Sequence, residues 1–142
     1  MAQMDKENVL FLCVANSARS QMAEGLLRSL AGERFEVHSA GLKPSQVNPY
    51  AVLAMKEVDI DISNHSSKSV SHYLGKVAFS YVISVCDEAN AECPTIFPFA
   101  REKLYWPFAD PAECEGDECL EKFRSIRDQI AEKIKTWLAT LG

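Results

Sequence analysis

Cys13 and Arg19 lie six positions apart in the segment CVANSARS, which spans residues 13–20. The residues between them are small or polar, so the backbone can curl around a guest and present its N–H groups to it. Arginine adds a planar fork that can hold two oxygens of one anion. Together these features predict a cradle for a tetrahedral oxyanion, with a cysteine thiol at its mouth.

A thiol in the positive field of such a cradle favours the thiolate, which is the nucleophilic form of cysteine. Cys13 is therefore expected to attack the bound oxyanion, and Ser20 to donate a hydrogen bond to its sulfur. The residues expected to bind the substrate are Val14, Ala15, Asn16, Ser17, Ala18, Arg19 and Ser20. The alternative for a cysteine at the end of a strand is a packing role in the core.

The elements that must position this loop alternate along the chain between strand-like and helix-like patterns. The predicted strands are residues 8–14, 35–41, 80–86 and 103–108. The predicted helices are one with apolar spacing over 22–30, one that Asn48 and Pro49 would begin, and a long one over 120–141. This order predicts an α/β fold, a four-stranded parallel sheet with helices on both faces.

In such folds reactive groups gather beyond the carboxyl ends of the strands. Cys13 ends the first predicted strand and Cys86 ends the third. Two thiols are therefore expected at the same edge of the sheet.

The composition is that of an ordinary globular chain. With 142 residues, of which 47% are hydrophobic, we expect one domain over residues 1–142. The formal charge of −5 argues against nucleic acid or an anionic membrane as a partner, but not against a small anion. No apolar run approaches the roughly 20 residues of a membrane span. The N-terminus lacks the layout of a signal peptide, so we expect a cytoplasmic protein. We also expect a monomer.

CVANSARS resembles the phosphate-binding loop of the low-molecular-weight protein tyrosine phosphatase superfamily, with its C-x5-R-S motif. The segments SQMAEG, HSAG, VNPYAVLAMKEVDIDISNH and the Asp-Pro pair at 110–111 are similar to those of one branch, the thioredoxin-coupled arsenate reductases. The resemblance runs from about residue 8 to the final helix and implies a flavodoxin-like three-layer sandwich. Two loop positions depart from the usual pattern: Ala15 replaces a glycine, and Ala18 replaces a second cysteine.

The resemblance implies a mechanism with three thiols. Cys13 attacks arsenate held by the loop amides and Arg19, while Asp110 protonates the departing oxygen. Cys86 then attacks the sulfur of Cys13 and arsenite leaves. Cys93 attacks Cys86, and thioredoxin reduces the resulting Cys86–Cys93 disulfide. Phosphate and sulfate are expected to bind as analogues of arsenate.

Two other functions stay open. A protein tyrosine phosphatase would need Cys13, Arg19 and Asp110 alone, although the segment DPAE lacks the tyrosines that usually flank the acid in such enzymes. A module without catalytic activity could bind an oxyanion or sense redox state, and use its thiols to switch a partner.

No tightly bound cofactor or metal is expected. Some relatives hold a potassium ion beside the loop, and Asn16, Glu24 and Ser39 match the positions used there. Lys68 replaces a carboxylate of that site, which speaks against the ion. The three histidines, at positions 38, 65 and 72, lack the spacing of metal ligands.

Cys114 and Cys119, in CEGDEC, are the remaining two of five cysteines. They could bind a metal, form a reversible disulfide or be incidental. A C-x4-C pair without a nearby histidine or second pair is a weak signal for zinc. An odd number of cysteines in a reducing compartment favours catalysis or redox chemistry over a structural disulfide framework.

Overall fold

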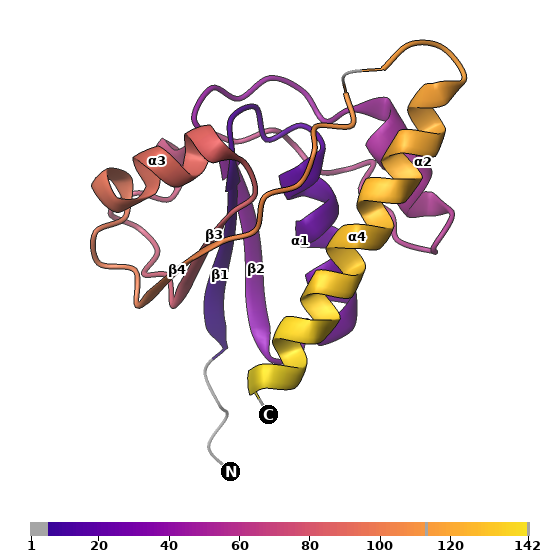
Figure 1. Cartoon of the computed structure of the whole chain (residues 1–142). Coiled ribbons are helices and arrows are strands. Elements are labelled where there is room, and N and C mark those ends of the chain that lie inside the picture. The colour runs from indigo at the N-terminus through magenta and orange to yellow at the C-terminus, as the bar shows by residue number, and fades with distance from the viewer. Residues whose placement is uncertain (1–5, 113, 142) are drawn as a thin grey trace.

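The computed structural model describes residues 6–112 and 114–141. Its centre is a parallel sheet with the strand order β2–β1–β3–β4 (Figure 1). The strands are β1 (Glu7–Cys13), β2 (Phe35–Gly41), β3 (Tyr81–Ser84) and β4 (Glu102–Tyr105). β1 is buried on both sides, and Val9, Leu10, Phe11 and Leu12 have no exposed surface. Such continuous apolar strands are typical of a sheet that is covered on both faces.

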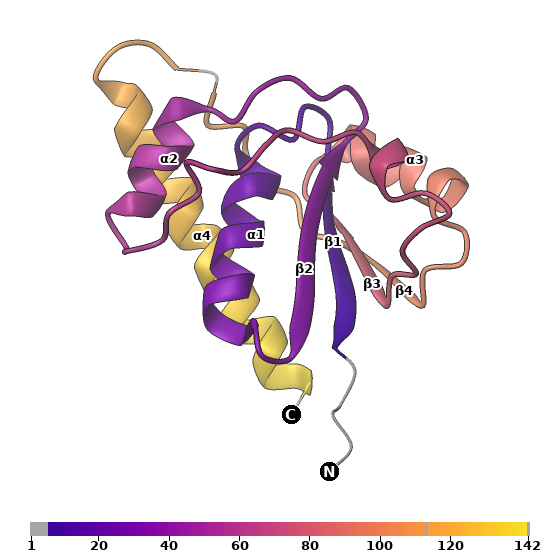
Figure 2. The same cartoon turned by 180° about the vertical axis from the view of Figure 1, so that it is seen from behind.

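Helices cover both faces of the sheet. They are α1 (Arg19–Ala31), α2 (Pro49–Lys56), α3 (Asp87–Ile96) and α4 (Glu118–Leu141), with a short 3-10 turn at Val70–His72. Figures 1 and 2 show α1, α2 and α4 together on one side of the sheet, with α3 on the other. The predicted three-layer α/β sandwich with four parallel strands is confirmed.

Local sequence explains where the first two helices begin and end. α1 buries Met22, Ala23, Leu26 and Leu27 and ends at Gly32, as predicted. The side chain of Asn48 accepts a hydrogen bond from the amide of Tyr50 at 2.8 Å, and Pro49 occupies the first turn of α2. Both are standard devices for starting a helix.

Aromatic packing fixes α4 to the sheet. The ring of Trp137 on α4 lies 5.5 Å from that of Phe35, 5.1 Å from that of Tyr81 and 5.6 Å from that of Trp106, measured between centroids. Phe35 and Tyr81 come from β2 and β3, and Trp106 follows β4. The C-terminal part of α4 therefore packs against β2, β3 and the start of the segment that follows β4.

The structure differs from the sequence prediction at α3, which was not predicted. The segment DEANAECPTI has few large apolar residues and a proline near its end, so no broad apolar stripe stands out. Among the side chains of α3 that the structure describes, Ala89 and Cys93 are buried, four positions apart, and Ile96 packs alongside. β3 and β4 also end two or three residues before their predicted limits. Over the described residues, no helix combines the length and hydrophobicity that crossing a membrane requires.

Candidate active site

The two central strands bring the predicted thiols to one edge of the sheet. Leu12 on β1 is in register with Ser84 on β3, and the amide of Val85 donates to the carbonyl of Leu12 at 3.0 Å. Cys13 ends β1, and Cys86 follows β3. From β1 the sheet grows in opposite directions toward β2 and β3, and at such a switch point the loops diverge and leave room for a ligand.

The loop after Cys13 has its carbonyl groups committed to the surrounding protein. Each carbonyl from residue 13 to residue 18 accepts a hydrogen bond from a group outside this segment. The donors are the amides of Met22, Leu42, Lys43, Ser45 and Asn48 and the side chains of Gln21 and Ser67. Within the described chain no acceptor meets the amides of Ala15, Ser17 and Ala18, which are free to bind an anion.

The start of α1 adds to this arrangement. Ala18 is the N-cap residue, and it provides no side-chain hydrogen bond to the first turn of the helix. A serine or aspartate at this position would satisfy one of those amides itself. An alanine leaves them available, together with the partial positive charge of the helix N-terminus, to a bound oxyanion.

Gly41 lies directly beneath the loop and makes its path possible. A Cβ atom at this position would lie 2.5 Å from the carbonyl oxygen of Val14 and 2.8 Å from the amide nitrogen of Asn16. Both are backbone atoms, which cannot rotate away as the end of a flexible side chain could. The segment HSAG was part of the sequence resemblance, but only the structure shows what its glycine does.

Asn16 and Ser20 both contact the sulfur of Cys13. The backbone of Asn16 is left-handed, with φ 50°, and its amide donates to the Cys13 sulfur at 3.2 Å. Its side-chain nitrogen donates to Ser20 Oγ at 2.9 Å, and Ser20 Oγ lies 3.0 Å from the sulfur. Because Ser20 already accepts from Asn16, its own proton is free to be donated to a thiolate.

Arg19 and Asp110 lie beside each other in the lining of a cavity of about 310 Å³. Cys13, the loop and Ala112 line the rest of the cavity. Arg19 Nη1 donates to the carbonyl of Phe108 at 3.0 Å, and its Nη2 lies 3.8 Å from Asp110 Oδ2. The other carboxylate oxygen of Asp110 accepts from the amide of Ala112 at 2.9 Å. Asp110 therefore forms a turn and still presents one oxygen to the site.

Cys86 is a buried thiol at the N-cap of α3, close to Cys13. Burial raises the pKa of its thiol, and N–H contacts from Ala89 and Val14 offset part of this rise. Val14 directly follows Cys13, so the contact places the Cys86 sulfur next to the start of the loop. The nearby Cys13 raises the pKa further, and Arg19 lowers it.

The family model described as low molecular weight phosphotyrosine protein phosphatase matches residues 8–142. The chain belongs to this family. It is 45% identical over 132 residues to arsenate reductase 2 of Staphylococcus saprophyticus, covering 93% of this chain and 96% of that protein. It is 42% identical over 139 residues to the arsenate reductase of Halalkalibacterium halodurans, covering 96% of this chain and 99% of that protein.

Solved structures agree with this family membership. An arsenate reductase in the phosphate-binding state superposes with a TM-score of 0.81 and 33% sequence identity, over 96% of this chain and 99% of that one. That reductase is in a phosphate-binding state, and phosphate is a tetrahedral oxyanion. The resemblance seen in the sequence, to the arsenate reductase branch of the phosphatase superfamily, is confirmed.

Within this phosphatase-family site, Cys93 stands apart from Cys86. It is 2% exposed and lies seven residues further along α3. Seven residues of α-helix span about 10 Å, whereas the Cα atoms of a disulfide are usually less than about 7 Å apart. Burial raises the pKa of the Cys93 thiol, and the Ser84 hydroxyl, which makes no hydrogen bond of its own in the described structure, offsets part of the rise. The two thiols therefore cannot bond while α3 is intact.

The residues matched to a potassium site do come together. Asn16 Nδ2 donates to Ser39 Oγ at 2.9 Å, and the Ser39 hydroxyl donates to Glu24 Oε1. Glu24 Oε2, however, pairs with Arg28 at 2.5 Å, and Lys68 Nζ lies 4.0 Å from Oε1. Two cationic side chains already face this buried carboxylate, so the residues do not fit an additional potassium ion.

This arrangement predicts that potassium has no specific effect on stability. An ion that binds only the folded protein raises its melting temperature. We expect the same Tm within about 1 °C in KCl and NaCl at equal ionic strength. Differential scanning calorimetry measures the Tm in both salts. The Lys68→Gln variant, in which Glu24 loses one of its two cationic neighbours, is measured in the same way. A Tm that is several degrees higher in KCl for the unmodified protein contradicts the expectation.

Proposed function

We propose that this protein reduces arsenate to arsenite through Cys13, Cys86 and Cys93, with thioredoxin as the electron donor. The observation that carries the proposal is the second buried thiol beside the oxyanion cradle. A phosphatase has no need of an oxidisable thiol at Cys86, whereas a reductase must supply two electrons. The two relatives compared above are arsenate reductases, which supports arsenate as the substrate.

The first step joins sulfur to arsenic. The thiolate of Cys13 attacks As(V) held by the loop amides and Arg19, and one arsenic–oxygen bond breaks. Asp110 gives its proton to the departing oxygen, which leaves as water. The product is an arsenate ester of the Cys13 thiol, in which arsenic is still pentavalent.

The second step transfers the electrons. Cys86 attacks the sulfur of Cys13, and a sulfur–sulfur bond forms as the sulfur–arsenic bond breaks. The electron pair of the broken bond goes to arsenic, which leaves as arsenite in the trivalent state. The two thiols together lose two electrons when they form the disulfide, and arsenic gains these two electrons, so the step is balanced.

The third step requires α3 to unwind. Cys93 attacks Cys86 and frees Cys13, but the intact helix holds the two sulfurs of α3 too far apart. The segment between them contains Asp, Glu, Ala and Asn, so it can rearrange with little loss of core packing. We expect amide hydrogen exchange over residues 87–93 to be faster in the oxidised protein. Equal protection in both redox states contradicts this step.

Replacing Asp110 by asparagine is expected to slow the first step on the order of 10²-fold, the lower range for a general acid. Asparagine keeps the turn to Ala112, because its side-chain oxygen can still accept that hydrogen bond, but it has no proton to give. Rapid-quench measurement of arsenate consumption in a single turnover reports the rate. Asp61→Asn, at an exposed turn away from the cavity, is the matched control. An unchanged rate for Asp110→Asn removes this residue from the mechanism.

The raised pKa of the Cys86 thiol predicts the pH dependence of the second step. Only the thiolate attacks, and at neutral pH it is a small fraction of a thiol whose pKa burial has raised. Arsenite release in a single turnover should therefore increase about tenfold per pH unit between about pH 6.5 and about pH 8.5. The Cys93→Ser variant isolates the first two steps. A flat profile contradicts attack by Cys86 as the slow step.

One assay compares the candidate functions. Arsenate is supplied with thioredoxin, thioredoxin reductase and NADPH, and hydrolysis of an aryl phosphate is measured in parallel. Arsenate-dependent loss of NADPH with formation of arsenite supports the reductase. Hydrolysis without NADPH loss supports a phosphatase, although the cavity offers Ala112 and no aromatic wall for a phenyl ring. If neither occurs, an oxyanion-binding or redox-sensing module remains.

A further inference from the structure

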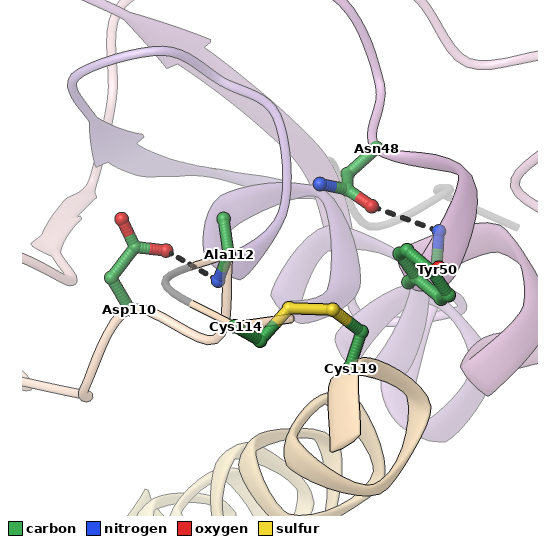
Figure 3. Close-up of a disulfide and its surroundings, with 6 residues drawn as sticks. All are labelled: Asn48, Tyr50, Asp110, Ala112, Cys114 and Cys119. Carbon is green, nitrogen blue, oxygen red and sulfur yellow. Dashed lines mark hydrogen bonds between the residues drawn. A yellow bond between two sulfur atoms is a disulfide. The ribbon is translucent and has the colours of Figure 1, made fainter. Parts of the chain in front are cut away.

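Cys114 and Cys119 form a disulfide, while Cys13, Cys86 and Cys93 are free thiols. Their Cα atoms are 5.2 Å apart, within the usual range for a disulfide. Figure 3 shows the bridge between the segment that carries Asp110 and the first turn of α4. Neither sulfur lines the cavity around Cys13.

We propose that this pair is a second redox site, whose disulfide holds Asp110 in place and whose reduction releases it. The segment concerned is residues 106–117, between β4 and α4, which we call the acid loop. The proposal rests on the proposed function in one respect, the role of Asp110 as proton donor. The redox behaviour of the pair does not depend on that role.

The first part of the acid loop is tied to the sheet edge. The amide of Trp106 donates to the carbonyl of Ser84 at 2.8 Å, and that of Phe108 donates to Val85 at 3.3 Å. The Phe108 carbonyl in turn accepts from Arg19. This half of the loop stays in position without any help from a disulfide.

The second part is held more loosely. For residues 109–112 and 114–117, the described backbone hydrogen bonds span no more than three positions. Among the described residues of this part, contact with the rest of the protein comes from the buried Pro111, from Cys114, which packs against the core, and from the 3.8 Å ion pair between Asp110 and Arg19. The sulfur bridge of Cys114, four residues after Asp110, therefore supplies the firm anchor for this part.

The other end of the bridge is rigid. Cys119 lies in the first turn of α4 and is 5% exposed. The first half of α4 packs against α2, where the ring of Phe123 lies 5.7 Å from that of Tyr50 and Arg127 donates to the carbonyl of Ala54 at 2.8 Å. A bond to this helix fixes Cys114 in the frame of the folded core, and Gly116, with φ 60°, allows the tight return of the chain.

The bridge lies where a reductant can reach it, and breaking it should affect only the segment around it. Cys114 is half-buried, and residues 115–118, which follow it, are exposed. The bridge closes a loop of few residues, and the stabilisation from a disulfide grows with the length of the loop that it closes. Reduction should therefore loosen the acid loop without unfolding the protein.

The chemistry balances with an external dithiol. A dithiol reductant such as dithiothreitol transfers two electrons and two protons, so that the Cys114–Cys119 bond breaks and the reductant becomes a disulfide. Oxidised dithiothreitol or oxidised glutathione drives the reverse reaction. Neither direction consumes arsenate or involves the thiol of Cys13.

The first test uses a Cys86→Ser/Cys93→Ser variant, in which the reductase thiols cannot form their own disulfide. The protein is equilibrated in dithiothreitol buffers of graded ratio, alkylated and mapped by peptide mass. We expect Cys114 and Cys119 to be reduced and reoxidised together, and amides 112–117 to exchange faster when reduced. Failure to reoxidise, or equal exchange in both states, overturns the proposal whether or not the protein reduces arsenate.

The second test asks whether the pair acts through Asp110. In the same variant, phenyl phosphate needs a proton donor for its poor leaving group, whereas 4-nitrophenyl phosphate has less need of one. Reduction of the disulfide, or the double substitution Cys114→Ser/Cys119→Ser, should slow the hydrolysis of phenyl phosphate roughly tenfold, which is part of what a general acid contributes. Hydrolysis of 4-nitrophenyl phosphate should slow less. With Asp110→Asn added, reduction should change neither rate.

An equal fall in the rates of both esters, or a fall that persists with Asp110→Asn, shows that the bridge acts on the fold instead. If neither ester is hydrolysed, the titration and the exchange data decide the redox site alone.

Discussion

Replacing Cys86 by serine is expected to abolish arsenate-dependent oxidation of NADPH in the presence of thioredoxin and thioredoxin reductase. Hydrolysis of aryl phosphates should survive, because it needs only the loop amides, Cys13, Arg19 and Asp110. Serine has the shape of cysteine without a sulfur that can be oxidised, so the arsenic ester on Cys13 has no partner to take its electrons. The loss of turnover should be complete, whereas the first step should proceed.

Cys93→Ser is the matched control for this prediction. It removes the other thiol of α3 and leaves the Cys86 step intact. A single turnover of the Cys93 variant should release arsenite and then stop as a Cys13–Cys86 disulfide, which peptide mapping detects. The Cys86 variant should release no arsenite. Continued turnover in the Cys86 variant means that another thiol of the chain takes its place, and the proposed order of steps is then wrong.

Replacing Gly41 by alanine should slow the first step between about 10²- and 10³-fold, the effect of losing a donor that binds a developing anion. The added Cβ would overlap the carbonyl of Val14 and the amide of Asn16, so the loop backbone has to move. A displacement of about 1 Å in a catalytic group can cost 10²-fold in rate. Here it shifts the anion-binding amides and the hydrogen bond to the Cys13 sulfur together.

Gly75→Ala is the control, because a Cβ there has nothing within 4 Å, although φ is 74°. It should lower thermal stability slightly and leave the rate unchanged. The affinity for sulfate or phosphate, measured by calorimetry, should fall for the Gly41 variant only. Normal oxyanion affinity and rate in the Gly41 variant would show that the loop tolerates the shift, and that its geometry is not set by this contact.

Most of the fold followed from local pattern. The apolar run that ends at Cys13, the helical spacing after Arg19 and the cap at Asn48 are signals carried by neighbouring residues. Parallel order then placed Cys13 and Cys86 at the same edge. The structure confirms the sheet and the helices built from these signals.

What the sequence did not predict depends on contacts between distant segments or on small residues. α3 buries Ala89 and Cys93, which give no large apolar stripe, so the helix was missed. The partners of four of the six loop carbonyls come from segments more than twenty positions away, and no local motif predicts them. The role of Gly41 is likewise visible only once the loop is seen to cross it. The disulfide between Cys114 and Cys119 was one of several possibilities in the sequence.

The contact between Trp106 and Trp137 gives the protein a built-in optical probe. These are its two tryptophans, and one begins the acid loop while the other sits on α4. Indole emission responds to polarity and to neighbouring rings, so intrinsic fluorescence should follow movement at the base of this loop without any label. Stopped-flow fluorescence could thus compare the time course of movement in this loop with that of arsenite release in a single reaction.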